Sequence, residues 1–273
     1  MVEKVHSITM TDWHCHLLPG IDDGPSEIAE SLEMAKILVQ SGFSKVCCTP
    51  HCMRGGYDAT SSEVRDAVRE LQGRLNAEGV RLILHPGREY YLDEYFSEYL
   101  ADPLLLGDSR NLLIEIPGYQ DPEYVRQTCY RIKMKGYVPV IAHPERCLLL
   151  TPPGRGEPFV DSGSKAKGSN PLLIKLANLC RSLLSSGNRE SHATRPESGY
   201  PASDLCEYLV DIGAKFQGNI GSFAGIYDDQ TKLRAQKFLR TGVYTHFGSD
   251  AHNSGTLATW LPVGLSCIGQ GER

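Results

Sequence analysis

The 273-residue sequence predicts an α/β barrel of seven parallel strands, and two observations support this prediction. First, short runs rich in apolar and β-branched residues alternate with segments of helical periodicity, an order that implies parallel strands joined by right-handed crossovers. Second, polar side chains capable of metal binding directly follow most of these runs. A closed barrel brings all of its strand ends to one rim, whereas a doubly wound sheet places its ligand at a single switch point.

Each predicted strand is a short apolar run that ends in a polar cluster. The strands are expected at residues 8–13, 45–49, 80–84, 111–116, 137–142, 214–219 and 243–248. Between them, apolar residues recur at helical spacing, as Ile28, Leu32 and Ala35 do, and this pattern is typical of amphipathic helices. The helices are expected at residues 27–41, 61–78, 122–135, 203–212 and about 230–241. Gly42 and Gly136 follow two of them as C-terminal caps.

The composition favours one globular domain over residues 1–273. Hydrophobic residues make up 41% of the chain and charged residues 22%, which is enough apolar surface for a core. The formal net charge of -5 argues against a nucleic-acid surface. Transmembrane and signal-peptide patterns are absent from the sequence. The nine cysteines show no regular spacing, so we expect no disulfide framework and a cytoplasmic protein without membrane insertion.

One low-complexity segment, residues 147–202, interrupts the alternation. Pro, Gly and Ser are abundant in residues 151–171 and again in residues 185–202. Between these stretches, the run PLLIKLANLCRSLLSS places its leucines on one helical stripe. We interpret the segment as an insertion into the barrel domain, with one helix packed on the barrel. A lid or a partner-binding helix is the alternative.

The candidate site residues follow the predicted strands. Residues i and i+2 of a strand face the same side, so His14 and His16 are expected to point into the barrel while Cys15 points outward. Asp250 and His252 repeat this spacing at the other end of the chain. Five histidines and four carboxylates are thereby expected at one rim. They are His14, His16, Asp23, His51, Glu89, Glu115, His143, Asp250 and His252.

Such a set predicts a metal centre. Carboxylates held together without a cation raise one another's pKa, and burying unpaired charge is costly. Mixed nitrogen and oxygen ligands suit Mn, Fe, Zn or Co rather than Ca. The ligands are too many for one ion, so we expect two or three divalent metal ions, bridged by a carboxylate such as Glu89. Separate polar pairs in the barrel mouth are the alternative.

A multinuclear site favours hydrolysis, because one metal activates a water while its neighbours hold the oxygens of the group under attack. Arg146 is a candidate catalytic residue, since a guanidinium on this loop can bind two phosphate oxygens. A rim salt bridge from Arg146 to Glu145 or Glu115 is the alternative. Asp23 is the second catalytic candidate, as the group that protonates the leaving group.

A cysteine-dependent phosphatase is a competing interpretation, because Cys48 and Arg54 have the spacing found in such enzymes. The loop between them, TPHCM, contains no glycine, and Pro50 has no backbone N–H to offer a phosphate. We therefore expect Cys47 and Cys48 to be small buried residues.

The motifs DWHCHLLPGIDDGP, TPHCM, HPGREYYL, LLIEIP, AHPERC, FQGNIGSFAG and GSDAHN occur in this order. The series resembles the polymerase and histidinol phosphatase (PHP) superfamily, and within it the bacterial manganese-dependent protein-tyrosine phosphatases that regulate capsule and exopolysaccharide synthesis. The resemblance covers about residues 11–146 and 203–253. It implies a distorted (β/α)7 PHP-type barrel with three metal ions, manganese before Fe, Zn or Co, at its C-terminal rim.

The resemblance also implies roles for particular residues. The nine candidate ligands match the metal ligands of the family, and Arg146 matches its phosphate-binding arginine. The implied substrate is a phosphotyrosyl protein, such as the Tyr-rich tail of a bacterial tyrosine autokinase. Two alternative functions remain: a phosphoesterase acting on a small molecule such as histidinol phosphate, and a catalytically weakened metal-binding homologue.

The sequence departs from the family pattern at its end and after AHPERC. No arginine occurs between His252 and Arg273, where the family carries a second phosphate-binding arginine. Arg54 and Arg88 are candidates for the missing charge. The ending also does not resemble the family's final helix. Residues 147–202 are inserted where the family passes directly to its next helix.

Overall fold

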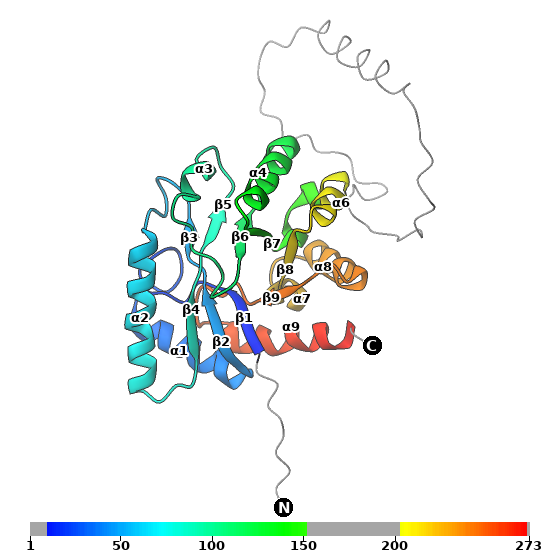
Figure 1. Cartoon of the computed structure of the whole chain (residues 1–273). Helices are drawn as coiled ribbons and strands as arrows, with labels where there is room; N and C mark the ends of the chain where they lie inside the picture. The colour runs from blue at the N-terminus through cyan, green and yellow to red at the C-terminus, as the bar shows by residue number, and fades with distance from the viewer. Residues whose placement is uncertain (1–9, 152–202, 272–273) are drawn as a thin grey trace, which may run out of the picture. The chain divides into compact units, whose positions relative to one another are not determined.

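The computed structural model describes residues 10–151 and 203–271, and every ladder between its named strands is parallel. The strands form the curled sheet seen in Figure 1. They are β1 (Met10–Cys15), β2 (Phe43–Cys48), β3 (His51–Cys52), β4 (Ile83–Pro86), β5 (Glu89–Tyr91), β6 (Asn111–Glu115), β7 (Val138–Ala142), β8 (Lys215–Asn219) and β9 (His246–Gly248).

The nine named strands correspond to the seven predicted ones, because two of the predicted strands are each interrupted and form two named strands. β2 continues into β3 past Pro50, which has no N–H for a ladder, and β4 continues into β5 past Gly87. One sheet has the order β1-β2-β4, and the other has the order β3-β5-β6-β7-β8-β9. The two sheets meet beyond β9, where the Asp250 N–H donates to the His14 carbonyl over 2.7 Å. The predicted α/β barrel is confirmed in this distorted form.

The predicted first and third strands end too early in the chain. The prediction placed them at residues 8–13 and 80–84, whereas the structure has Met10–Cys15 and Ile83–Pro86. Polar residues that seemed to end the strands are part of them, because pairing continues toward the rim. The Thr49 N–H, for example, donates to the Cys15 carbonyl over 2.9 Å. His14 therefore lies inside β1, where the sheet itself fixes its backbone.

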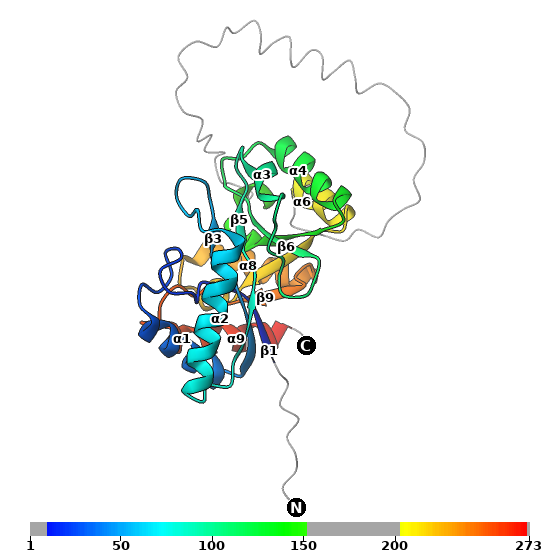
Figure 2. The same cartoon turned by 60° about the vertical axis from the view of Figure 1, so that its left-hand side comes forward.

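The helices lie outside the sheet, with α1, α2 and α9 toward one end and α3, α4 and α6 toward the other in both views (Figures 1 and 2). Their bounds are α1 (Ile28–Gln40), α2 (Ser61–Ala77), α3 (Phe96–Tyr99), α4 (Pro122–Met134), α6 (Asp204–Asp211), α7 (Ile220–Ala224), α8 (Asp229–Thr241) and α9 (Leu257–Gly271), with 3-10 turns η1 (Pro144–Arg146) and η2 (Leu148–Leu150). Sequence signals explain several starts. Thr60 and Glu63 form a capping box, and Asp121 caps the turn that Pro122 begins.

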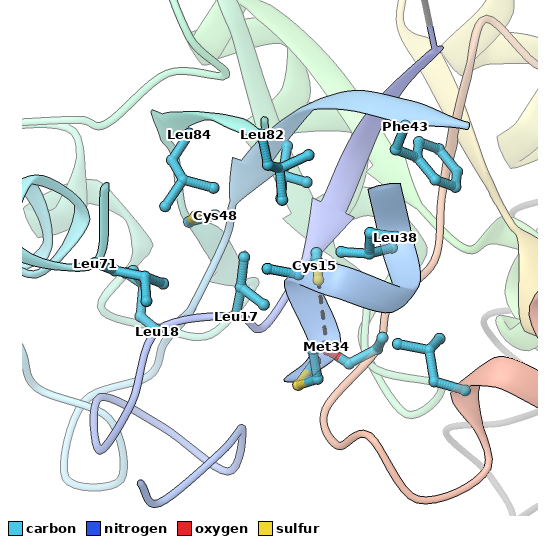
Figure 3. Packing of buried hydrophobic residues seen from close by; sticks show 14 of the residues in the cluster. Cys15, Leu17, Leu18, Met34, Leu38, Phe43, Cys48, Leu71, Leu82 and Leu84 are labelled. Atoms are coloured by element: carbon cyan, nitrogen blue, oxygen red, sulfur yellow. Dashed lines mark hydrogen bonds between the residues drawn. The ribbon is translucent and has the colours of Figure 1, made fainter. Parts of the chain in front are cut away.

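Two apolar clusters hold the helices on the sheet. One packs α1, α2 and α9 against β1, β2 and β4, and the other packs α4 and α6 against the middle strands. Figure 3 shows the first, in which Cys15 and Cys48 lie among leucines and the Cys15 thiol donates to the Ala251 carbonyl over 3.7 Å. Cys15 is therefore turned away from the barrel interior, and Cys47 and Cys48 are buried, as expected from the sequence.

Residues 257–271 form α9, although their sequence does not resemble the final helix of the family. Pro262 and Gly264 are poor helix formers, but tertiary packing overrides propensity here. Leu257 and Leu261 are buried in the first apolar cluster. A Cβ on Gly264 would lie 2.3 Å from the Ile220 carbonyl oxygen, so the glycine allows α9 to approach α7 closely.

Residues 147–151, at the start of the segment interpreted as an insertion, pack with the barrel. Cys147 and Leu150 are buried, and the Ser203 hydroxyl donates to the Leu149 carbonyl over 2.5 Å. Residues 152–202, including the helix predicted there, lie outside the described residues. A single domain over residues 1–273 stays a prediction. Within the described ranges, no helix is long and apolar enough to cross a membrane.

Candidate metal centre

The nine candidate ligands gather at the C-terminal ends of the strands. Donor atoms of eight of them lie within 4.8 Å of one another in three overlapping groups. The groups are His16, Asp23, His51 and His252; His14, His16, Glu89 and Asp250; and His51, Glu89 and Glu115. The ninth, His143, places its Nε2 2.9 Å from Glu89 Oε1. Shared residues connect all three groups, so they form one cluster.

Glu89 lies at the centre of this cluster. Its Oε2 is 3.2 Å from His14 Nε2, 3.4 Å from His16 Nε2 and 3.0 Å from His51 Nδ1. Its Oε1 faces His143. The side chain is fully buried because β5 sits between β3 and β6. One carboxylate therefore faces histidines that three different strands position, β1, β3 and β7.

The chemistry of the donor atoms fits divalent metal ions. Glu89 Oε2 is buried without a hydrogen-bond partner, although three imidazole nitrogens lie close to it. His14 Nε2 and His16 Nε2 are only 3.1 Å apart. Buried nitrogen and oxygen atoms that lie this close together without satisfying one another's hydrogen bonds are arranged to bind a shared cation. Mixed histidine and carboxylate ligands suit a transition metal. The cluster therefore fits a metal site.

The ionisable groups of the cluster depend strongly on one another. Burial alone would lower the pKa of His14, but the carboxylates of Glu89 and Asp250 raise it to about 9. Burial and the neighbouring Glu89 raise the pKa of Glu115. Burial would raise the pKa of Asp250, yet His14 and His16 hold it well below its usual range. Without a cation, the carboxylates thus require protonated histidines as counter-charges.

Asp23 lies at the solvent edge of the cluster. Its Oδ1 is 3.4 Å from His252 Nε2 and 3.7 Å from His51 Nε2, while 48% of its side chain is exposed. The Pro-Gly-Ile-Asp-Asp turn between β1 and α1 brings it back over the rim. This placement combines contact with two candidate ligands and access to an incoming molecule.

Two candidate ligands hold unusual backbone conformations. His143 and Asp250 are the non-glycine residues with positive φ in the described ranges, at 29° and 53°. Such conformations are unfavourable for residues with a Cβ and persist where the surroundings enforce them, most often at functional sites. His143 directly follows β7 and Asp250 is the second residue after β9, and the turn directs their side chains back into the barrel mouth.

Several residues that orient the ligands were missed by the sequence analysis. Asp22 Oδ2 accepts hydrogen bonds from His16 Nδ1 over 2.7 Å and from the His51 N–H over 2.9 Å. Gln217 Oε1 lies 2.8 Å from His14 Nδ1. The bonds at Nδ1 leave the Nε2 atoms of His16 and His14 directed into the cluster. Asp22 could have been found from its position beside Asp23, but nothing in the local sequence marks Gln217.

Asp12 joins the two ends of the chain at this site. Its buried Oδ1 accepts from the His14 N–H over 3.1 Å and from the Ser249 N–H over 2.9 Å. Burial raises the pKa of Asp12 to about 6, although the hydrogen bonds from Ser249 and His14 oppose this. The backbone of one candidate ligand is thereby tied to the segment that carries Asp250.

Arg146 lies beside the cluster, in η1. Its Nη1 donates to Asp250 Oδ2 over 2.8 Å, and its guanidinium lies 4.7 Å from the ring centroid of Tyr227. Its carboxylate partner is therefore Asp250 rather than Glu145 or Glu115, the alternatives considered from sequence. The Glu145 carboxylate is instead turned inward, where it accepts from the Tyr244 hydroxyl over 2.9 Å.

The two arginines considered for the missing charge are engaged elsewhere. Arg54 Nη1 donates to both carboxylate oxygens of Glu98, over 3.1 and 2.9 Å. Arg88 is buried and donates to the carbonyls of Ala59 and His51. Arg88 therefore supports the backbone of a candidate ligand, and neither arginine supplies a second phosphate contact here.

The cysteine alternative finds no support in the geometry. Cys48 is fully buried, and burial raises its thiol pKa well above the ordinary value. A buried thiol with a raised pKa is a poor nucleophile. Arg54, its expected partner, is exposed and paired with Glu98.

Comparison with known proteins agrees with the site. The family model described as capsular polysaccharide synthesis, CpsB/CapC, matches residues 10–153. The chain is 32% identical to tyrosine-protein phosphatase YwqE of Bacillus subtilis (strain 168) over 246 residues, which cover 89% of this chain and 78% of YwqE. It is 27% identical to tyrosine-protein phosphatase CpsB of Streptococcus pneumoniae over 139 residues, which cover 50% of this chain and 57% of CpsB.

A solved structure shares the fold. It is described as belonging to YwqE from Bacillus subtilis and CpsB from Streptococcus pneumoniae, metal-dependent tyrosine phosphatases. The match has a TM-score of 0.69 and 30% sequence identity, and it covers 96% of this chain and 87% of the solved one. The family model matches more than half of the sequence, and the likeness to YwqE extends over most of it. The chain therefore belongs to the CpsB/CapC family of capsular polysaccharide synthesis.

Proposed function

We propose that this protein is a metal-dependent tyrosine-protein phosphatase that acts in the regulation of capsular or exopolysaccharide synthesis. The observation that carries the proposal is the buried cluster around Glu89, which fits metal ions, in a chain 32% identical to a named tyrosine-protein phosphatase. The YwqE and CpsB structure is described as that of metal-dependent tyrosine phosphatases. The cluster and the relatives thus support the same chemistry.

The nine residues of the cluster are the proposed metal ligands, holding two or three divalent ions, with manganese as the proposed metal. They are His14, His16, Asp23, His51, Glu89, Glu115, His143, Asp250 and His252. Bound ions would activate water for attack on phosphorus and neutralise charge on the phosphate oxygens. Glu89 is the proposed bridge, because its two oxygens face histidines from three strands, β1, β3 and β7.

The chain itself contributes binding and proton transfer. Arg146 is the proposed phosphate ligand, since its guanidinium is stacked on Tyr227 and one side of the side chain is open to solvent. Its bond to Asp250 holds it beside the cluster before substrate arrives. Asp23, half-exposed at the edge, is the proposed donor of a proton to the departing phenolate oxygen.

A phosphotyrosyl protein is the proposed partner, and the Tyr-rich tail of a bacterial tyrosine autokinase is the proposed source. A flexible tail suits an open rim site, because it can present each phosphotyrosine without unfolding a domain. We also propose a cytoplasmic location. The cysteines in residues 10–151 and 203–271 are all free thiols, as expected in a reducing compartment.

The test combines metal analysis with turnover of a phosphotyrosyl peptide in the presence of Mn, Fe, Zn or Mg. We expect two or three ions per chain, and loss of both metal and activity in the His14→Ala/His16→Ala variant. Cys48→Ala should retain activity. Full activity without the two histidines would refute the proposal, as would loss of activity in Cys48→Ala with its metal intact.

Two other outcomes would redirect the assignment. Faster turnover of histidinol phosphate than of the phosphotyrosyl peptide would favour a small-molecule phosphoesterase. Full metal content without turnover of either substrate would favour a binding homologue weakened by the absent second arginine.

A further inference from the structure

Tyr57 stands next to the candidate metal centre without belonging to its ligand groups. It lies in the turn after β3, where the Tyr57 N–H donates to the Met53 carbonyl over 2.8 Å. Its ring stacks on the imidazole of His51, with centroids 5.3 Å apart and an interplanar angle of 21°. The turn therefore presents an aromatic ring at the rim, directly beside a proposed ligand.

The turn is held in place by contacts that do not involve the Tyr57 side chain. The Arg54 N–H donates to the Tyr99 hydroxyl over 2.9 Å, and the Arg54 guanidinium lies 4.3 Å from the ring centroid of Tyr95. The paired carboxylate of Glu98 completes this attachment to α3 and the segment before it. Replacing the Tyr57 ring should therefore leave the turn itself in position.

Two further tyrosines, Tyr91 and Tyr119, lie near the other end of the ligand group formed by His51, Glu89 and Glu115. Tyr91 follows Glu89 at i+2 on β5, so both side chains face one side, and it is the register partner of Glu115 on β6. Its hydroxyl is 3.0 Å from the hydroxyl of Tyr119, a residue that is 75% exposed. The group of His51, Glu89 and Glu115 is thus flanked by Tyr57 beside His51 and by Tyr91 beside Glu115.

Tyr227, another tyrosine near the cluster, is already engaged. Its ring carries the guanidinium of Arg146, and its hydroxyl accepts from Asn219 Nδ2 over 2.9 Å. Tyr227 therefore supports Arg146, the proposed phosphate ligand. The aromatic rings available to a substrate lie on the side of β3, β5 and β6.

We propose that Tyr57 and the Tyr91–Tyr119 pair form an aryl subsite that selects phosphorylated phenols over phosphorylated alcohols. This inference rests on the proposed function and names the residues that set its substrate class. In a phenyl phosphate, a single oxygen separates the ring from phosphorus. When the phosphate lies on the cluster, the ring must therefore lie at the rim. Aromatic side chains there stabilise a bound ring, whereas an alkyl group gains little from them.

The test compares Tyr57→Leu, Tyr57→Phe and Tyr119→Leu with the unmodified protein. Tyr130→Leu on the outer face of α4 is the matched control, since Tyr130 is also exposed. The measurements are metal content, kinetics with a phosphotyrosyl peptide and with ethyl phosphate, and inhibition by phenylphosphonate and methylphosphonate. The two phosphonates share the anionic group and differ in the ring alone.

We expect Tyr57→Leu to raise KM for the peptide and the inhibition constant of phenylphosphonate by about five- to tenfold, from lost aromatic stacking. Its kcat, its metal content and its response to methylphosphonate and ethyl phosphate should stay within about twofold. Tyr57→Phe and Tyr130→Leu should resemble the unmodified protein. Tyr119→Leu should weaken inhibition by phenylphosphonate but not by methylphosphonate, although Tyr119 has no recorded contact with a proposed metal ligand.

Three results would overturn the subsite. Unchanged inhibition by phenylphosphonate in both Tyr57→Leu and Tyr119→Leu would exclude the aryl subsite. Equal weakening of both phosphonates, or loss of metal from Tyr57→Leu, would show that Tyr57 merely supports His51. Failure of the proposed function is distinguishable, because the unmodified protein would then turn over no aryl phosphate, although binding of the two phosphonates could still be compared by calorimetry.

Discussion

The carboxylate of Asp22 fixes the orientation of His16, because Asp22 Oδ2 accepts from His16 Nδ1 over 2.7 Å. The bond places the proton of the imidazole on Nδ1 and leaves Nε2 directed into the cluster. Burial would raise the pKa of Asp22, but its bond to His16 lowers it to about 2, so the residue is a carboxylate at neutral pH. Asp22 therefore acts on a proposed ligand without being one.

Asp22→Ala should bind metal about 10- to 100-fold more weakly, the usual effect of removing a residue that orients a ligand. Titration with Mn followed by calorimetry measures the change, and excess metal should restore much of the activity. Asp66→Ala is the control, since Asp66 is an exposed acid on α2 paired with Arg69. Equal metal affinity in the two variants would contradict the role given to Asp22.

Arg146→Ala should lower kcat/KM for the phosphotyrosyl peptide by about 100-fold or more, because a phosphate would lose a charged bidentate partner. Arg146→Lys keeps the charge but not the planar fork, and it should recover less than half of this loss on a logarithmic scale. Steady-state kinetics provide the measurement, with metal content as the control. Loss of metal from Arg146→Ala would instead mean that the bond to Asp250 holds the ligand in place.

Gly248→Ala should destabilise the fold, because its Cβ would lie 2.5 Å from His14 Cβ, where β9 and β1 approach each other. We expect a loss of about 2 kcal/mol or more in the free energy of unfolding, together with reduced metal content. Gly73→Ala in α2 is the matched control. Its Cβ would meet nothing within 4 Å, so a helix-favouring residue should add about 0.5–1 kcal/mol. Urea denaturation distinguishes the two, and similar midpoints would contradict the close approach.

His246 should make stability depend on pH. Burial, and secondarily Lys215, lower its pKa to about 4, so the unfolded chain takes up a proton before the folded one as pH falls. The contribution is fully present above the ordinary pKa of about 6.5 and is lost between there and pH 4. After discounting for partial solvent access, the loss is about 2 kcal/mol.

The measurement is the free energy of unfolding of the unmodified chain minus that of His246→Gln, with chelator present in both. Glutamine retains an acceptor for Asn111 Nδ2, which lies 3.2 Å from His246 Nε2. The difference should fall as pH is lowered from 7 to 4, while contributions of the other histidines cancel. A difference that stays constant with pH would contradict a neutral, buried His246.

Strand positions and the candidate ligands were accessible from sequence because both are local properties. The apolar runs predict strands in or beside which His14, Glu89 and Asp250 lie, and parallel strands bring their C-terminal ends together. The bounds were less accurate, as at β1 and β4, since polar residues in the barrel interior look like the start of a loop. The helix α9 was not predicted, because Gly264 is a poor helix former and only the close approach of Ile220 explains a glycine at this position.

The sequence by itself determined the α/β barrel, the set of proposed ligands and the expectation of a metal centre. The tertiary structure alone decided which side chains orient those ligands, because hydrogen-bond partners here are distant in sequence. Gln217 lies 203 positions from His14, and Asp250 lies 104 positions from Arg146. Such pairs depend on how a curled sheet brings the ends of its strands together. The periodicity of a short segment does not predict these contacts between distant segments.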